Sequence, residues 1–192
     1  RSLQAVVGGS ADIVSGAFEH TISMQTRGQA MQSFVLQGRA PQVVFAVSNK
    51  TMPEYKSLTD LRGKKIGVTE PGSSSQVIAN FVLGQAGVKP SEVSFIGVGA
   101  SSAAVAAMRS GQIDAFTNLD PVIATLERDN LIRIVADTRK VEESDKIFGG
   151  PMVAGCLYAP TRYITKNPEI IQGLTNAVVR ADKWLAKATA EE

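Results

Sequence analysis

One pattern occurs twice in this sequence, and the repeat constrains the fold more than any other feature. A helix-forming apolar segment, a glycine, one polar residue and a short apolar strand run through residues 3–16 and again through residues 105–118. Gly9 corresponds to Gly111, and Asp12 corresponds to Asp114, 102 positions later. Such an offset is too long for a solenoid repeat. It predicts two similar α/β lobes, unless a common helix–glycine–strand connection has arisen twice by chance.

Composition excludes several classes of function. The 192 residues have a net charge of +2, and the basic residues are scattered, so we expect no nucleic-acid partner. Cys156 is the only cysteine, which excludes an internal disulfide and a cysteine-based zinc site. No apolar run reaches the roughly eighteen residues of a membrane span. Neither metal-ligand spacing nor a nucleotide-binding glycine motif is present, so we expect no metal and no cofactor.

Helix and strand patterns alternate along the whole sequence, which is typical of an α/β fold. The polar, proline-containing stretch 49–56 and the turn at residues 149–151 indicate two crossings between lobes. We therefore predict one lobe from residues 1–50 and 151–192 and a second from residues 51–150, with hinge crossings near 48–53 and 149–155. The abrupt start of the chain, and its end inside a helix-favouring run, predict an excerpt of a longer protein.

The sharpest candidate site follows the predicted strand 66–69. Gly72, Ser73, Ser74 and Ser75 precede an amphipathic helix, where unpaired backbone N–H groups and the helix dipole attract anions. Serine hydroxyls at that position can bind the anion as well. The alternative is simple helix capping, because one of these serines must cap the helix in any case.

A second candidate follows the predicted strand 112–117. Asn118 can donate and accept hydrogen bonds, and Asp120 can receive a cationic group or act only as a helix N-cap, which we favour. Both residues follow the carboxyl end of a strand, where ligands bind in open α/β sheets. We therefore predict that both loops line a cleft between the lobes.

The matching position of the first lobe follows the predicted strand 11–15. Ser15, Gly16 and Ala17 would bring backbone N–H groups to the strand end, and His20 is the only histidine of the chain. A lone histidine is more often structural than ligand-binding, and both interpretations stay open. We include His20 among the candidate ligand contacts.

No catalytic set emerges from the sequence. Cys156 lies in an apolar strand pattern, where we expect it to be buried and inert. The only tryptophan, Trp184, belongs to the helical pattern that starts at residues 167–168, and we expect it in the core.

Residues 55–68 resemble the "SLxDLxGKKxGV" segment of solute-binding proteins of ABC importers, in the branch that binds nitrate, sulfonates, taurine and thiamine precursors. Residues 9–12, 72–75, 110–115 and 163–169 also resemble that branch, in the same order. The resemblance implies a two-lobed type II periplasmic-binding fold, here without its N-terminal strand–helix–strand. It implies a monomer in the periplasm or outside the cell that closes on a small anionic solute and delivers it to a membrane permease, without catalysis.

Two other functions share this fold. One is the binding or synthesis of a thiamine precursor, a pyrimidine, and in related synthases a histidine is chemically essential. The other is the effector domain of a transcription regulator, which requires a helix-turn-helix upstream.

Overall fold

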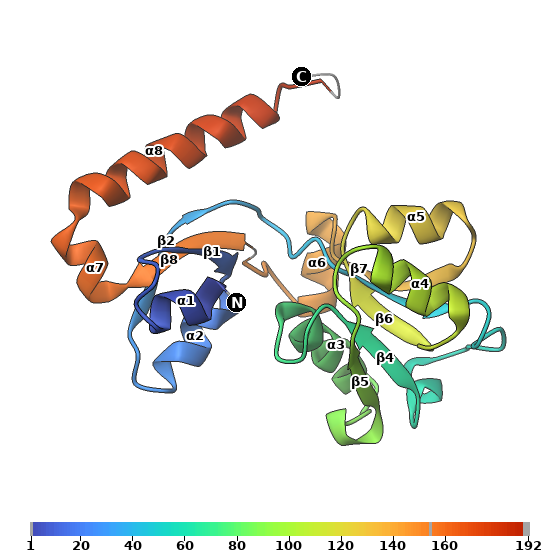
Figure 1. Ribbon diagram of the computed structural model, residues 1–192. Helices are drawn as coiled ribbons and strands as arrows, with labels where there is room; N and C mark the ends of the chain where they lie inside the picture. The colour runs from blue at the N-terminus through green and yellow to red at the C-terminus, as the bar shows by residue number, and fades with distance from the viewer. Residues whose placement is uncertain (1, 154, 190–192) are drawn as a thin grey trace. The chain divides into compact units, whose positions relative to one another are not determined.

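The computed structural model describes residues 2–153 and 155–189, and the chain divides into two compact units (Figure 1). Unit 1 comprises Arg1–Pro41 and Met152–Glu192, and unit 2 comprises Gln42–Pro151. Each unit contains its own sheet and its own helices, so the predicted α/β class is confirmed.

Unit 2 is built on a five-stranded sheet of order β5-β4-β6-β3-β7. The pairings β4–β5 and β4–β6 are parallel, whereas β3 runs antiparallel to both β6 and β7. The strands are β3 (Val44–Ser48), β4 (Lys65–Val68), β5 (Ser94–Gly97), β6 (Ala115–Asn118) and β7 (Ile132–Asp137). The helices are α3 (Ser74–Gln85), α4 (Ser102–Ser110), α5 (Val122–Arg128) and α6 (Val141–Phe148), with the 3-10 turns η1 (Leu58–Leu61) and η2 (Pro90–Glu92).

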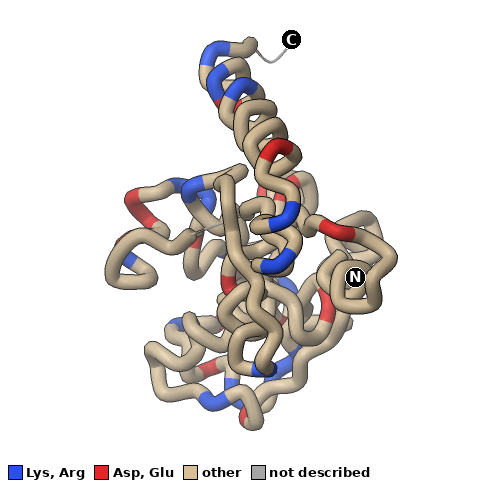
Figure 2. Tube along the Cα trace, turned by 90° about the vertical axis from the view of Figure 1, so that its left-hand side faces the viewer, with Lys and Arg blue, Asp and Glu red and all other residues tan. Residues whose placement is uncertain are grey.

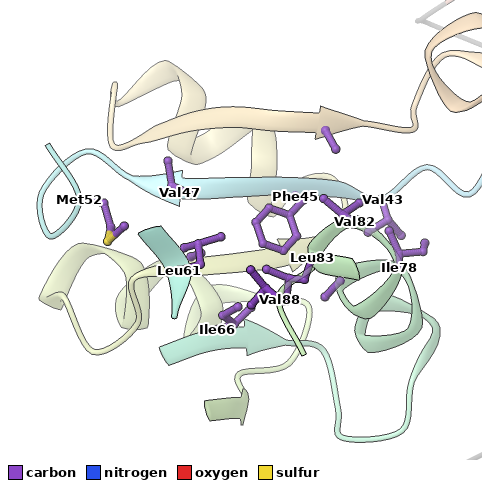
Figure 3. Packing of buried hydrophobic residues seen from close by; sticks show 13 residues of the cluster. Val43, Phe45, Val47, Met52, Leu61, Ile66, Ile78, Val82, Leu83 and Val88 are labelled. Atoms are coloured by element: carbon purple, nitrogen blue, oxygen red, sulfur yellow. The ribbon is translucent and has the colours of Figure 1, made fainter. Parts of the chain in front are cut away.

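Strand β3 is buried on both faces, which explains its uninterrupted apolar sequence. Phe45 and Val47 pack into the cluster on one face, with Ile66 and Leu83 (Figure 3). Val44 and Ala46 belong to a second cluster, which includes Phe116, Met108 and Ile123. Both faces of the sheet are therefore covered, and the carboxyl-terminal ends of its strands connect to loops at the edge.

Unit 1 has a smaller sheet of three strands, in the order β1-β8-β2. The strands are β1 (Val14–Ala17), β2 (Met31–Leu36) and β8 (Gly155–Pro160), and β8 runs antiparallel to both neighbours. The helices are α1 (Ser2–Val7), α2 (Glu19–Gln25), α7 (Thr161–Lys166) and α8 (Pro168–Leu185). The buried core is Val6, Val14, Met24, Met31, Cys156 and Tyr158. Trp184 is 52% exposed, so its predicted place in the core is wrong.

The two copies of the repeat adopt the same local structure in different sheets. Helix α1 is followed by Gly9 at φ 78° and then β1, and α4 is followed by Gly111 at φ 82° and then β6. A positive φ favours glycine because it lacks Cβ, so the repeated glycine ends each helix in the same way. The first strand runs over Val14–Ala17, so the predicted strand 11–15 starts three residues too early and ends two residues too early.

The predicted boundary between the lobes is wrong at its first crossing. Strand β3 was assigned to the first lobe, but it pairs with β6 and β7 in the sheet of unit 2. The chain therefore passes from unit 1 to unit 2 at Pro41–Gln42 and not at residues 48–53. The return, between Pro151 and Met152, falls within the predicted range 149–155.

Candidate functional site

The carboxyl ends of the parallel strands β5, β4 and β6 meet at one edge of the unit 2 sheet. The loop after β4 leads to the predicted residues 72–75. The predicted residue 118 is the last residue of β6, and residue 120 lies in the loop that follows this strand. This edge is where an open α/β sheet offers a ligand its loops and helix N-termini. The structure thus brings the two second-lobe candidate loops to the same edge of unit 2.

Three hydroxyl groups form a closed cluster at the start of α3. Thr69 Oγ1 lies 3.0 Å from Ser73 Oγ and 2.9 Å from Ser75 Oγ, and the two serine oxygens are 2.9 Å apart. The backbone N–H of Thr69 also donates to Ser75 Oγ at 2.9 Å. Ser73 occupies the N-cap position with extended backbone but makes no side-chain capping bond. The hydroxyls of Ser73 and Ser75 therefore bind one another, which argues against simple side-chain capping.

The remaining donors at the start of α3 are those of Ser74 and the helix backbone. The Ser74 side chain is half-buried, and no residue in the described part of the chain hydrogen-bonds to its hydroxyl. Its N–H and that of Ser75 have no backbone acceptor among the described residues. The N–H of the predicted Gly72 donates to Gln76 Oε1 at 2.7 Å. Among the described residues, these two N–H groups and this hydroxyl therefore have no hydrogen-bond partner, and they lie where the α3 dipole is positive.

Asn118 is the last residue of β6, at the predicted carboxyl end of the strand. Its side chain is fully buried, with Nδ2 donating to the Gly99 carbonyl at 2.9 Å and Oδ1 accepting from the Leu119 N–H at 3.0 Å. These bonds tie the loop after β5 to the end of β6. In unit 2, Asn118 positions the loops of the edge, and it offers no exposed polar surface for a ligand contact.

Asp120 is not the N-cap residue that we favoured, because Pro121 occupies that position of α5 and Asp120 precedes it. Its Oδ1 accepts from the Ala124 N–H at 2.9 Å, and its Oδ2 lies 3.6 Å from Arg139 Nη1. Arg139 also forms ion pairs with Asp137 at 2.7 Å and Glu127 at 3.0 Å. The bond with Asp137 raises the pKa of the guanidinium, and the same bond lowers the pKa of the Asp137 carboxyl. Both oxygens of the Asp120 carboxylate therefore have partners within the protein.

Arg139 was not among the residues that the sequence singled out. In the structure, Asp137 ends β7, and Val141–Phe148 form α6. Thr69 was not among the residues singled out either, although it is a hydroxyl residue at the end of the predicted strand 66–69 and comes directly after β4. The role of Thr117, which donates to the Ser75 carbonyl at 2.9 Å, depends on strand pairing and gave no local signal.

In unit 1, the predicted residues Ser15, Gly16 and Ala17 lie within β1 and not in the loop that follows it. Ser15 Oγ donates to Gln37 Oε1 at 2.8 Å. His20 is half-buried in the first turn of α2, and its Nδ1 lies 3.1 Å from the Tyr158 hydroxyl. Tyr158 is fully buried, and burial raises the pKa of its phenol. His20 therefore has a structural partner on β8.

Cys156 is fully buried, as predicted, and burial raises the pKa of its thiol. A protonated thiol in that position is a poor nucleophile. Across residues 2–153 and 155–189, no group of three or more His, Cys, Asp or Glu residues could hold a metal ion. Within the same residues, no helix combines the length and the hydropathy that crossing a membrane requires.

An apolar groove of about 840 Å³ lies between α4 and α5 of unit 2. Val105, Val122 and Thr125 line it along the helices, and Ser101 and Pro121 line it near the edge loops. It includes none of the predicted site residues. The hydroxyl cluster and this groove are therefore separate features of unit 2.

Comparisons with known proteins place this geometry in context. A solved structure from Bordetella bronchiseptica RB50 is 58% identical, with a TM-score of 0.95, over 98% of this chain and 59% of that chain. The periplasmic aliphatic sulphonate-binding protein SsuA of Escherichia coli is 25% identical, with a TM-score of 0.68, over 95% of this chain and 58% of that chain. A curated protein of Brucella abortus (strain 2308), named as a binding protein, is 31% identical over 68% of this chain and 39% of its own length.

These similarities confirm the predicted periplasmic-binding fold and the branch of ABC-importer binding proteins that the sequence resembles. The chain spans about three fifths of the Bordetella structure and about two fifths of the Brucella relative. The names of the Escherichia coli and Brucella proteins both contain the words "binding protein", whereas that of the Bordetella structure states no function. The model of the NMT1-like family matches residues 4–192, and the chain belongs to that family.

Proposed function

We propose that the whole protein binds a small anionic organic solute of the sulfonate class and delivers it to the membrane permease of an ABC importer. The observation that carries this proposal is the start of α3. There, two free N–H groups and the free hydroxyl of Ser74 adjoin a closed cluster of three hydroxyls. The named function of the Escherichia coli relative supports the choice of a sulfonate.

The physical reason is the preference of a helix N-terminus for negative charge. The first N–H groups of α3 have no intrahelical acceptor, and the aligned peptide dipoles place about half a positive charge there. A sulfonate has three acceptor oxygens, which suit several convergent donors. The hydroxyl cluster and the bond from Thr117 to the Ser75 carbonyl fix the first turn of α3 before the ligand binds. Such preorganisation reduces the entropy lost on binding.

The proposed anion site has an acidic residue nearby in the sequence. Glu70 lies two residues before Gly72 and is exposed, and its carboxylate carries the same charge as the proposed ligand. Exposed charges interact weakly in water and are screened by salt. We infer that Glu70 lowers the affinity modestly without preventing anion binding.

We further propose that unit 1 supplies other ligand contacts, with His20 as the first candidate. The proposed setting is the periplasm, and the proposed working form is a monomer. A binding protein of this kind releases its ligand chemically unchanged.

Titration of the whole natural protein with methanesulfonate, taurine, nitrate, acetate and a hydroxymethylpyrimidine would test the proposal. Binding would be measured by calorimetry and thermal unfolding, and the ligand would be recovered for mass spectrometry. A true ligand at a hundred times its Kd should stabilise the protein by about 2.7 kcal/mol. Preference for acetate or the pyrimidine over both sulfonates would refute the proposed ligand class. A chemically altered ligand would refute the binding-only function.

The site itself is tested by Ser74→Ala, with Ser91→Ala as the matched control. Ser91 is an exposed serine in η2 of the same unit. We expect Ser74→Ala to weaken sulfonate binding about tenfold, because a hydrogen bond to a charged group contributes roughly 1.5 kcal/mol. The control should bind as the unchanged protein does. Equal affinities of the two variants would exclude the Ser74 hydroxyl from the site.

A further inference from the structure

The groove between α4 and α5 takes no part in the proposed anion site. The two helices lie side by side and cover the same face of the unit 2 sheet (Figure 1). One wall is a single face of α4, since positions three and four apart are neighbours on a helix, and its residues are Ser102, Val105, Ala106, Arg109 and Ser110. Val122 and Thr125 of α5 line the other wall. All these residues belong to the contiguous, fully described residues 42–151, so unit 2 forms the groove by itself.

The size and the lining of the groove fit an elongated apolar ligand. Its volume of about 840 Å³ lies in the range of small-molecule sites, roughly 300–1,000 Å³. From Ser102 to Arg109 it follows α4 for about 10 Å, at 1.5 Å per residue. Val122 is buried, and Val105 is half-buried. An unbranched alkyl chain would therefore lie along the groove and cover these two valine side chains.

The walls of the groove favour an alkyl chain over an extended peptide. Both walls are helices, and the backbone N–H and C=O groups inside a helix are paired with one another. An extended peptide gains affinity mainly where a sheet edge offers it unpaired backbone groups. An alkyl chain requires no hydrogen bonds, so helical walls cost it nothing.

The end of the groove at Arg109 has an excess of positive charge. The guanidinium groups of Arg109 and Arg128 both bond to the carboxylate of Asp129. The Nζ of Lys50 donates to the carbonyls of Arg109 and Ser110 at 3.0 and 3.1 Å. Three cations therefore surround one carboxylate. Figure 2 shows basic and acidic residues interspersed along the chain, so this excess is a local feature.

We propose that this groove is a second binding site, which takes an amphiphilic monoanion with an unbranched apolar tail. The tail lies between α4 and α5 over Val105 and Val122, and the anionic head group bonds to Arg109. The bond to Asp129 uses only Nη2 of Arg109, and a guanidinium carries five N–H donors. These donors suit the two oxygens of a carboxylate. The groove shares no residue with the start of α3, so its ligand need not be the transported solute.

Calorimetric titration of the whole natural protein with hexanoate, octanoate and decanoate would test the proposal. Affinity should rise about twofold to fourfold for each added methylene that the groove buries. Decanol should bind about tenfold more weakly than decanoate, because it lacks the charged hydrogen bond. Saturating methanesulfonate should leave decanoate binding unchanged. Equal affinities along the series, or displacement of decanoate by methanesulfonate, would overturn the proposal.

Filling the groove gives a second measurement. Ala106→Phe places a ring in the groove, and Ala103→Phe is the matched control, because Ala103 is an exposed alanine of the same helix that does not line the groove. We expect Ala106→Phe to weaken decanoate binding by about tenfold or more, since the ring displaces several methylenes of the tail. The control should bind as the unchanged protein does, and both variants should melt at similar temperatures. Equal decanoate affinities in the two variants would place the ligand elsewhere.

Arg109→Gln tests the head group, with Arg62→Gln as its control. Arg62 is an exposed arginine of the same unit that pairs with Glu92. Arg109→Gln should weaken decanoate binding about tenfold and leave decanol binding unchanged, because only decanoate bonds to the guanidinium. An equal loss for both ligands would show that Arg109 only shapes the groove, against the proposal.

Two other occupants are outcomes of the same experiments. Self-association that Ala106→Phe abolishes, measured by sedimentation without decanoate, would assign the groove to a second copy of the protein. Binding to phosphatidylglycerol vesicles without binding of free decanoate would assign it to a membrane surface. Either result would overturn the proposal. A protein that binds decanoate but no sulfonate would refute only the proposed function, so the two failures are distinguishable.

Discussion

Replacing Asn118 with alanine distinguishes a positioning residue from a ligand contact. The substitution removes two buried hydrogen bonds, one to the Gly99 carbonyl and one from the Leu119 N–H. Each bond contributes about 1 kcal/mol, and a buried partner left unpaired costs about 1–3 kcal/mol. Gly99 is half-buried, so water can replace part of the hydrogen bond that its carbonyl loses. We therefore expect Asn118→Ala to reduce the unfolding free energy of unit 2 by about 2–3 kcal/mol.

The measurement must report on unit 2 alone, because two units need not unfold together. Native-state hydrogen exchange at the central strands β3 and β6 gives the unfolding free energy of that unit. Ser74→Ala is the comparison, since the Ser74 hydroxyl has no partner in the described part of the chain, and it should change stability by less than about 0.5 kcal/mol. If Asn118→Ala leaves the exchange of β3 and β6 unchanged and still abolishes solute binding, the positioning role is refuted.

Three further predictions concern unit 2. Gly67→Ala should destabilise the unit by about 1–2 kcal/mol in urea unfolding, because a Cβ there would lie 2.7 Å from Ile113 Cδ1. A variant as stable as the unchanged protein would contradict this packing. Glu70→Gln should raise sulfonate affinity by up to about threefold in calorimetry at low salt, with the gain lost at high salt, and a lower affinity would show that the carboxylate assists binding. The folded-state pKa of Asp137 is depressed from its ordinary value of 3.8, so its stabilising effect is present above that value and is lost as the pH falls through the lower folded pKa. Arg139→Met should therefore make unfolding less dependent on pH below about 4, and an unchanged pH profile would exclude this pair as its source.

Local signals made part of this protein predictable from its sequence. The start of α3 was located because glycine and serine interrupt the pattern between a short apolar strand and an amphipathic helix. The two copies of the repeat were found because a helix that ends at a positive φ favours glycine in both places. The resemblance to ABC-importer binding proteins rested on such short-range motifs. Each of these features depends on residues that are close along the chain.

The tertiary structure decided which strands pair and which side chains are covered. The sequence of an apolar strand such as β3 does not indicate which strands pair with it, so β3 was assigned to the wrong sheet. Asn118 became a positioning residue because the loop after β5 returns to the end of β6. Trp184 was assigned to the core because its helical pattern is amphipathic, yet the pattern specifies only which face is apolar. Whether that face is buried depends on chain segments distant in sequence, and such contacts exist only once the chain is folded.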